Sequence, residues 1–310
     1  MTVHYSLDSA DVSPFVTAIL RAVDNPEGYF VFADWLEEQG DPRGELIRVQ
    51  WELEFPSLSA SRRRELKQVE SELLKQFSDV WLGDLAPMFL KNARLPSIRG
   101  AMARPFVWQF QRGFPDSLQV SSFPPGFCGI LRASSLPRLL RSLSIRHPGG
   151  RGIAERECAD LGSTLMPNLR GLELVNFLGV EPYLSLSGNE SLRRLESLVI
   201  EPVTAVPDIS GLCAFFRNPA LTNIRHLTLS SAGNDAIVEE LTSSDLFFQL
   251  ESLDLSFGSV TDDGIHLLIE AGLDHLADLN VSLNLLTEEG MLLLEAEHPD
   301  AVIRPQTSAT

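Results

Sequence analysis

Cysteine is scarce in this sequence, and no hydrophobic run is long. The three cysteines, Cys128, Cys158 and Cys213, are an odd number at wide spacings, which excludes a disulfide framework and a paired Cys-x-x-Cys metal site. No stretch reaches the roughly 18 apolar residues that a membrane span needs. The first residues also lack a basic segment followed by an apolar one. We therefore expect a cytoplasmic protein with no membrane association.

Basic residues are almost missing from the C-terminal part. The formal net charge is −17, and from His226 onward there are 16 acidic residues and a single basic one, Arg304. Such a surface repels a phosphate backbone, so we expect no nucleic-acid partner. The same charge favours solubility and basic partners, but it does not indicate a fold.

The sequence does contain a repeated Leu-x-x-Leu-x-Leu frame, and this repeat predicts the architecture. Successive frames start 29, 26, 29, 26 and 26 residues apart. Their apolar positions are Leu140/Leu143/Ile145, Leu169/Leu172/Leu174, Leu195/Leu198/Ile200, Ile224/Leu227/Leu229, Leu250/Leu253/Leu255 and Leu276/Leu279/Val281, with a weaker copy at Pro115/Leu118/Val120. The last two apolar positions of a frame are two residues apart, so they point to one side of a short strand.

Between the frames, apolar residues recur at helical spacing. Thr261 precedes Asp262-Asp263 and Thr287 precedes Glu288-Glu289, which is typical of a hydroxyl cap and acidic first turn at a helix start. A longer spacer at 181–189 is expected to be a loop that interrupts a helix. One strand and one helix cannot bury their apolar faces alone, so neighbouring units must stack.

This pattern resembles the leucine-rich repeat family, and the period of 26 to 29 resembles its ribonuclease-inhibitor-like subclass. The resemblance covers about residues 115–300. It implies an α/β solenoid over residues 101–310, with about six or seven repeats, parallel strands on the concave face and helices outside. It also implies an asparagine that bonds backbone groups in the turn after each strand. Asn284 occupies that position and Asn176 comes one place early, whereas the other frames have Gly258, Ala232, Val203 and Pro148 there. The resemblance therefore implies a looser or irregular ladder in those frames.

Residues 11–90 have a different hydrophobic pattern, in which apolar residues fall on successive helical faces. A long motif in this region reads Phe32-Ala-Asp-Trp-Leu-Glu-Glu-Gln-Gly-Asp-Pro-Arg-Gly-Glu-Leu-Ile-Arg-Val-Gln50. With Asn25-Pro26, Trp81-Leu82-Gly83 and Arg112-Gly113-Phe114, it closely resembles the bacterial repeat-companion domain, which commonly precedes leucine-rich repeats. We expect an all-α unit over residues 1–100, with four or five helices. A hairpin over residues 103–120 should then cap the first repeat.

Motifs for catalysis, metal binding or phosphate binding are weak throughout the sequence. Cys158-Ala159-Asp160 offers a nucleophile, but nearby acids oppose formation of its thiolate. The six histidines are scattered without zinc-site spacing, and Gly149-Gly150-Arg151-Gly152 lacks the Lys-Ser/Thr of a phosphate-binding loop. We therefore expect a non-enzymatic protein without a metal or cofactor. An alternative is an adaptor or enzyme-associated protein whose N-terminal helices recruit or carry an activity. These two functions would be distinguished by whether Asp34, Glu45 and Arg48 line a pocket or pair with one another.

A partner would bind to the concave face, where side chains between the buried leucines point outward. The predicted contact residues are Arg146, Glu173, Glu201, His226, Thr228, Ser230, Ser252, Asp254, Ser256, Asp278, Asn280 and Ser282. Serines dominate this face, and no aromatic anchor is evident in the frames. We expect a monomeric protein-interaction scaffold with an unidentified protein partner, preferably a basic or polar segment. The other interpretation of the same face is a merely solvated sheet surface.

Overall fold

Equivalent leucines of successive frames are direct neighbours in one sheet. The computed structural model describes residues 4–7, 9–87, 95–96, 102–103, 106–121, 125–146, 155–177, 179–202 and 208–307. In it, the second apolar position of each frame pairs with the same position of the next frame, in the order Leu118, Leu143, Leu172, Leu198, Leu227, Leu253 and Leu279. The predicted repeat is therefore confirmed, and its register is unbroken across the described strands.

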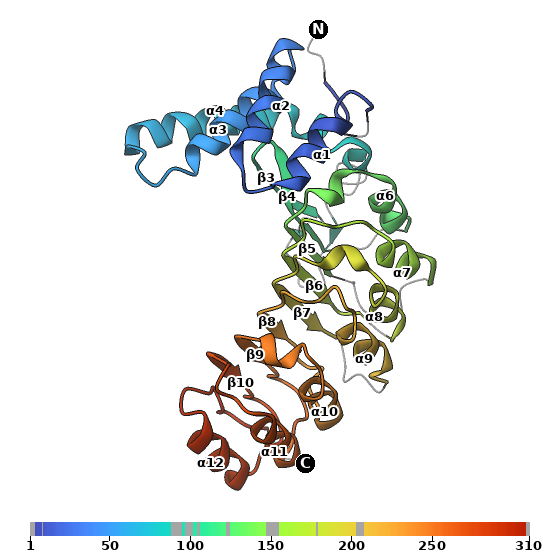
Figure 1. Ribbon diagram of the computed structural model, residues 1–310, viewed down its shortest axis with the longest axis vertical. Coiled ribbons are helices and arrows are strands. Elements are labelled where there is room, and N and C mark those ends of the chain that lie inside the picture. The colour runs from blue at the N-terminus through green and yellow to red at the C-terminus, as the bar shows by residue number, and fades with distance from the viewer. Residues whose placement is uncertain are drawn as a thin grey trace.

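The sheet has eight strands in the order β10-β9-β8-β7-β6-β5-β4-β3, and all pairs from β4 to β10 are parallel. Its strands are β3 (Phe106–Gln111), β4 (Phe114–Val120), β5 (Ser142–Arg146), β6 (Gly171–Val175), β7 (Ser197–Glu201), β8 (His226–Thr228), β9 (Ser252–Asp254) and β10 (Asp278–Asn280). Figure 1 shows these strands along the inner side of a curved solenoid, with the helices on its outer side. This is the α/β leucine-rich-repeat fold.

A helix follows each strand of the repeats and covers the buried side of the sheet. These helices are α6 (Phe127–Ala133), α7 (Glu155–Gly162), α8 (Glu181–Leu186), α9 (Ser210–Phe216), α10 (Asp235–Thr242), α11 (Asp262–Ala271) and α12 (Glu288–Glu297). Short 3₁₀ turns precede several strands, at η2 (Leu136–Arg138), η3 (Glu190–Leu192) and η4 (Phe247–Gln249). The prediction of a loop at 181–189 is wrong for residues 181–186. Helix α8 occupies them and buries Tyr183 and Leu186 in the core.

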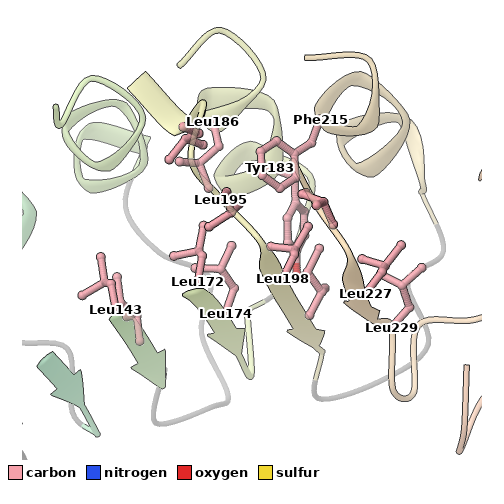
Figure 2. Close-up of a cluster of buried hydrophobic side chains, with 14 of the residues drawn as sticks. Leu143, Leu172, Leu174, Tyr183, Leu186, Leu195, Leu198, Phe215, Leu227 and Leu229 are labelled. Atoms are coloured by element: carbon pink, nitrogen blue, oxygen red, sulfur yellow. The ribbon is translucent and has the colours of Figure 1, made fainter. Parts of the chain in front are cut away.

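The core is one layer of side chains between sheet and helices. In Figure 2, Leu172, Leu174 and Leu198 point from the strands toward the helices. Tyr183, Leu186 and Phe215 contribute to the same cluster from the helical side. Every apolar position of the six strong frames is at most 4% exposed. Removal of one such leucine side chain leaves a cavity that typically costs about 2–5 kcal/mol.

Four helices form most of the described N-terminal part: α1 (Ser13–Arg21), α2 (Pro26–Glu38), α3 (Arg43–Leu53) and α4 (Ala60–Trp81), followed by the 3₁₀ turn η1 (Gly83–Leu85). In Figure 1 the hairpin of α3 and α4 projects away from the solenoid. Residues before position 100 are not entirely helical, because β1 (Leu95–Pro96) pairs with β2 (Met102–Ala103). The predicted boundary after residue 100 therefore falls between two paired strands.

The predicted hairpin is present and connects the helices to the repeats. Strands β3 and β4 pair antiparallel, and Arg112 and Gly113 between them have φ of 53° and 81°. Two left-handed residues form the turn that suits a two-residue hairpin. Gly113 also has no space for a side chain, because a Cβ there would lie 2.2 Å from Cγ1 of Ile47. The hairpin thus presses directly against α3.

The hydrophobic core crosses from the helices into the repeats. Phe114 of β4 and Leu139 belong to the cluster that contains Phe32 and Ile47 of the helices. Conversely, Trp81 of α4 belongs to the cluster of the repeats. Two cores that exchange residues in this way couple the N-terminal helices to the first repeats.

The last repeats share a hydrogen-bonded ladder at their helix starts. Asp235 at the start of α10 accepts hydrogen bonds from the backbone N–H and hydroxyl of Thr261 (2.8 and 2.7 Å). Asp262 binds Thr287 of the next repeat in the same way, with 2.9 Å to its backbone N–H and 2.5 Å to its hydroxyl. Both threonines also cap their own helices, as the sequence predicts. Each repeat therefore supplies a carboxylate to the next.

Asn284 performs the role implied by the family resemblance. It is fully buried, and its amide donates to the carbonyls of Leu255 and Val281 at 2.9 Å. Its side-chain oxygen accepts from the backbone N–H of Val260 at 2.9 Å. Asn176, one place early, instead takes the left-handed backbone position with φ of 62°. A segment after α12 then covers the edge of the sheet, with Val302 bridged to Asn280.

Candidate functional site

The concave face consists of side chains aligned in columns by the strand register. One column runs Ser142, Gly171, Ser197, His226, Ser252 and Asp278, and the next runs Ser144, Glu173, Val199, Thr228, Asp254 and Asn280. Neighbouring parallel strands lie about 4.8 Å apart. The register therefore brings together residues that are 25 or more positions apart in the chain. The two columns lie side by side and form one surface.

The structure brings most of the predicted contact residues to this surface. His226 and Asp278 are exposed. A larger group is partly exposed, and it comprises Arg146, Glu173, Glu201, Thr228, Ser230, Ser252, Asp254 and Asn280. These ten residues occupy successive repeats from β5 to β10. They form a continuous polar surface rather than an enclosed pocket.

Two predicted contact residues are buried, which corrects the expectation that they are available to a partner. Ser256 is 4% exposed and Ser282 is 8% exposed. In each case the polar residue two positions earlier forms a hydrogen bond with the serine. The carboxylate of Asp254 accepts from the backbone N–H of Ser256 at 2.8 Å, and the Asn280 amide oxygen accepts from the Ser282 hydroxyl at 2.7 Å. Ser256 and Ser282 thus position other residues of the face.

An aromatic side chain adjoins this surface, although the frames contain none. Phe257 follows strand β9 and is 61% exposed, with φ of 60°. Ser231 and Leu283 have the same left-handed backbone conformation at the equivalent positions. The backbone N–H of Phe257 donates to the carbonyl of Ser282 at 3.1 Å, which fixes it beside the next repeat. Alignment of the repeats by their frames would have indicated that Phe257 is exposed, because it lies outside the buried frame positions.

The left-handed conformation of Phe257 is a recurring feature of the repeats, because Asn176, Ser231 and Leu283 adopt it at the same position of their frames. A non-glycine residue with positive φ costs about 1–2 kcal/mol, and bulky residues there are genuine outliers. Asparagine or glycine would be accommodated more readily at that position. Because the conformation recurs from repeat to repeat, the large exposed ring of Phe257, and not its backbone strain, makes it a candidate anchor of the surface.

The acidic residues of the concave face are incompletely neutralised. Glu173 is balanced in part by Arg146, at 3.8 Å, and accepts from the Ser144 hydroxyl at 2.6 Å. Among the described residues, Glu201, Asp254 and Asp278 have no basic group within 4 Å. The face therefore becomes more negative toward the C-terminal repeats, where negative charge attracts cationic groups.

The N-terminal residues that would distinguish the two functional classes do not form a pocket. Arg48 of α3 forms an ion pair with Asp34 of α2, and its Nε donates to Glu37 at 2.8 Å. All three side chains are at least two-fifths exposed. Glu45 is exposed, outside this group. Asp34 and Arg48 thus neutralise each other across a helical hairpin at the surface.

Cys128 and Cys158 are unsuited to nucleophilic chemistry. Burial, followed by the negative charge of Glu157, raises the pKa of Cys128 well above its ordinary value. Burial, followed by the charges of Glu181 and Glu157, raises the pKa of Cys158 to about 11. Thiols with raised pKa values hold their protons at neutral pH and react slowly. The Cys158-Ala159-Asp160 triplet is therefore a structural part of α7.

Within the described ranges, no three His, Cys, Asp or Glu side chains are grouped to hold a metal ion. The helices in the same ranges include none with the length and hydrophobicity to cross a bilayer. His147 and the glycine-rich segment 149–152 lie outside the described residues.

Comparison with known proteins gives only distant structural likenesses. No family model and no curated protein matches the sequence. A protein from Bacteroides fragilis has a TM-score of 0.41 and 16% identity, over 80% of this chain and 85% of that one. An internalin from Listeria monocytogenes has a TM-score of 0.37 and 13% identity, over 75% and 70%. Human trophoblast glycoprotein has a TM-score of 0.34 and 20% identity, over 61% and 65%. Scores this low carry no argument about function.

Proposed function

We propose that this protein is a non-catalytic protein–protein interaction scaffold that binds its partner through the concave face of the repeats. The observation that carries the proposal is the column of polar side chains held in register over strands β5 to β10. A broad, rigid surface of this kind suits another macromolecule better than a small substrate. The repeat-companion and ribonuclease-inhibitor-like assignments, a cytoplasmic location and a monomeric state belong to the same proposal.

The partner is a protein segment that carries basic side chains. Glu201, Asp254 and Asp278 supply negative charge, and no described basic group within 4 Å neutralises them. Lysine or arginine of a partner would complete these ion pairs. A nucleic acid would be repelled by the same charges.

Phe257 is the apolar anchor of this binding surface. It is 61% exposed beside the acidic residues Asp254 and Asp278 of the concave face. Aromatic side chains supply a large contact area, and a few such anchors dominate most interfaces. A partner with an apolar pocket next to a basic patch fits both features.

A charge-reversal experiment tests this proposal. We would compare proteins captured from native lysate by the wild type and by the Asp254→Lys/Asp278→Lys variant. The matched control is Glu270→Lys/Glu297→Lys, which makes the same change in net charge on the outer helices α11 and α12, where both glutamates are exposed. Purified partners would then be measured by calorimetry against all three proteins, with Phe257→Ala as a fourth.

The expected result is a partner whose binding is lost in the concave variant and kept in the control. Replacement of Phe257 should weaken that binding by about tenfold or more. Equal capture by wild type and concave variant would refute the proposal. Equal loss in both charge-reversed variants would show that only the net charge matters.

A further inference from the structure

An apolar strip borders the concave face at its C-terminal end. Phe257 and Leu283 follow strands β9 and β10 at equivalent positions of their frames, and both have the left-handed backbone conformation. The backbone N–H of Leu283 donates to the carbonyl of Pro305 at 2.6 Å, which places the segment after α12 beside it. Phe257 is 61% exposed, Pro305 is exposed and Leu283 is partly exposed. These three residues are named the rim strip.

The fold does not require apolar side chains at these positions. The position of Phe257 and Leu283 is occupied by Asn176 after β6 and by Ser231 after β8, with the same backbone conformation. Val302 adds another apolar group at the end of the sheet, because it pairs with Asn280 and is 52% exposed. Single exposed apolar residues are normal on a protein surface, whereas adjacent ones mark interaction sites.

The acidic groups beside the rim strip have no basic neighbour. Asp254 and Asp278 lie on adjacent strands, and no described basic group is within 4 Å of either carboxylate. From His226 onward the single basic residue is Arg304. It pairs instead with Glu288 of α12, at 3.0 Å. The cations that would neutralise Asp254 and Asp278 therefore have to come from a partner.

The spacing of the rim strip matches one face of an α-helix. Neighbouring strands are about 4.8 Å apart, so the two steps from Phe257 through Leu283 to Pro305 cover about 10 Å. Along an α-helix, residues i, i+4 and i+7 share a face and cover about 10.5 Å. Along an extended strand, three successive side chains of one face cover about 13 Å. A helix that crosses the strands therefore keeps its side chains in step with the rim.

We propose that the concave face binds an amphipathic α-helix that lies across strands β9 and β10. Its apolar stripe packs on the rim strip, where the Phe257 ring enters the gap between two turns. An adjoining stripe of lysine or arginine faces Asp254 and Asp278. This binding mode rests on the interaction function proposed above, and it adds the conformation and the residue pattern of the partner.

A synthetic peptide with this pattern is the probe. It is an alanine-based peptide of about 18 residues, which is long enough to form a helix in water. Leucines at i, i+4, i+7 and i+11 form the apolar stripe, and a lysine after each leucine forms the basic stripe. Binding would be measured by fluorescence anisotropy of the labelled peptide at constant ionic strength. We expect saturable binding with a Kd on the order of 100 μM.

Three comparison peptides separate shape from charge. One has the same composition in an order that forms no stripe, one has a central proline that breaks the helix, and one has glutamates in place of the lysines. Each should bind about tenfold more weakly or not at all. A helix-breaking proline costs about 3 kcal/mol in a helix interior, so the second peptide tests the conformation directly.

Variants of the protein connect the binding to the rim strip. Phe257→Ser and Leu283→Ser introduce the residue that Ser231 already holds at the equivalent position, so the backbone accommodates it. Each should weaken binding of the amphipathic peptide about tenfold. Leu292→Ser is the matched control on helix α12, where Leu292 is 57% exposed, and it should bind as the wild type does. Phe257 is the more exposed of the two rim leucine and phenylalanine side chains, so its variant keeps the proposal testable if Leu283→Ser fails to fold.

Several results would overturn the proposal. Absence of saturable binding of the amphipathic peptide to the wild type is one, and unchanged binding to Phe257→Ser or to folded Leu283→Ser protein is another. Equal binding of the reordered or proline-containing peptide would exclude a helix, and equal binding of the glutamate peptide would exclude the charge complementarity. The broader scaffold function is tested separately, by the proteins that the Asp254→Lys/Asp278→Lys variant captures.

Discussion

Asp24 and Arg170 are 146 positions apart in the chain, and Oδ2 of the aspartate accepts a hydrogen bond from Nη2 of the arginine at 2.9 Å. Arg141 and Arg112 approach the same carboxylate to 3.4 and 3.7 Å. One residue of the loop between α1 and α2 thus joins the hairpin and the starts of two repeat strands. Sequence inspection could not suggest this contact, because Asp24 belongs to neither the repeat frames nor the N-terminal motif.

Replacement of Asp24 by asparagine should weaken the connection between the helices and the repeats. The side chain is 61% exposed, so solvent screens its ion pairs. We expect a loss of about 0.5–1 kcal/mol in the free energy of unfolding, measured with urea. The difference should shrink in 1 M NaCl. Asp11→Asn is the control, since Asp11 is exposed with no ion pair in the described chain. An equal effect of both variants would contradict the connection.

Gly290→Ala should disrupt the ladder of helix starts. A Cβ at Gly290 would lie 2.1 Å from Oδ1 of Asp262, the atom that accepts from the Thr287 backbone. Either the helix or the aspartate must move, which we expect to cost about 1–3 kcal/mol in urea unfolding. Gly188→Ala is the control, because a Cβ at Gly188 would meet no atom within 4 Å. Unchanged stability of the Gly290 variant would mean that Asp262 moves without cost.

The three cysteines should differ in their rate of alkylation. Burial raises the pKa of all three thiols, but Cys128 and Cys158 are buried whereas Cys213 is only partly buried. In folded protein at pH 8, iodoacetamide should modify Cys213 first, followed far more slowly by the other two. Mass spectrometry of the digested protein would establish the order. Equal rates in 8 M urea would confirm that folding is responsible, and fast labelling of Cys158 in the native state would contradict it.

Alkaline pH should lower the stability through the same thiols. The pKa of Cys158 is about 11 in the folded protein, whereas that of an unfolded thiol is about 8.5. Unfolded chains therefore release the proton first as the pH rises. The stability is fully present below about pH 8.5 and is lost between there and about pH 11. The urea midpoint should fall over this range, and it should fall less steeply for Cys158→Ala. An identical slope would refute the assignment.

Phe257→Asn should raise the stability while it weakens any partner binding. Asparagine adopts the left-handed conformation more readily, and an exposed phenylalanine contributes little burial. We expect a gain of about 0.5–1 kcal/mol in urea unfolding. Phe248→Asn is the comparison, since Phe248 is similarly exposed at 56% but has no positive φ. It should show no gain. A destabilised Phe257 variant would indicate an intramolecular role for that ring.

The sequence was sufficient for the repeats because leucine at fixed spacing is itself the cause of the fold. Each frame must bury the same positions, and Leu143, Leu172 and Leu198 do so in one register. Helix starts at Thr261 and Thr287 were predictable for a similarly local reason. Frame position also brought ten of twelve predicted contact residues to the concave face.

Features that depend on distant side chains could not be predicted in this way. Ser256 and Ser282 are buried and bonded to Asp254 and Asn280, and frame position specifies neither feature. The prominence of Phe257 depends on the backbone conformation after β9. These are the features on which the proposal for the concave face rests.

The carboxylate-to-threonine ladder makes the last repeats interchangeable. Asp235 contacts Thr261, Asp262 contacts Thr287, and the two junctions use the same atoms. Excision of the 26-residue unit 261–286 would bring Thr287 into the position of Thr261, with its hydroxyl facing Asp235. Duplication of that unit would likewise recreate the same bonds at each new junction. Evolution or design can therefore lengthen or shorten this binding surface one whole repeat at a time, without the invention of a new interface between repeats.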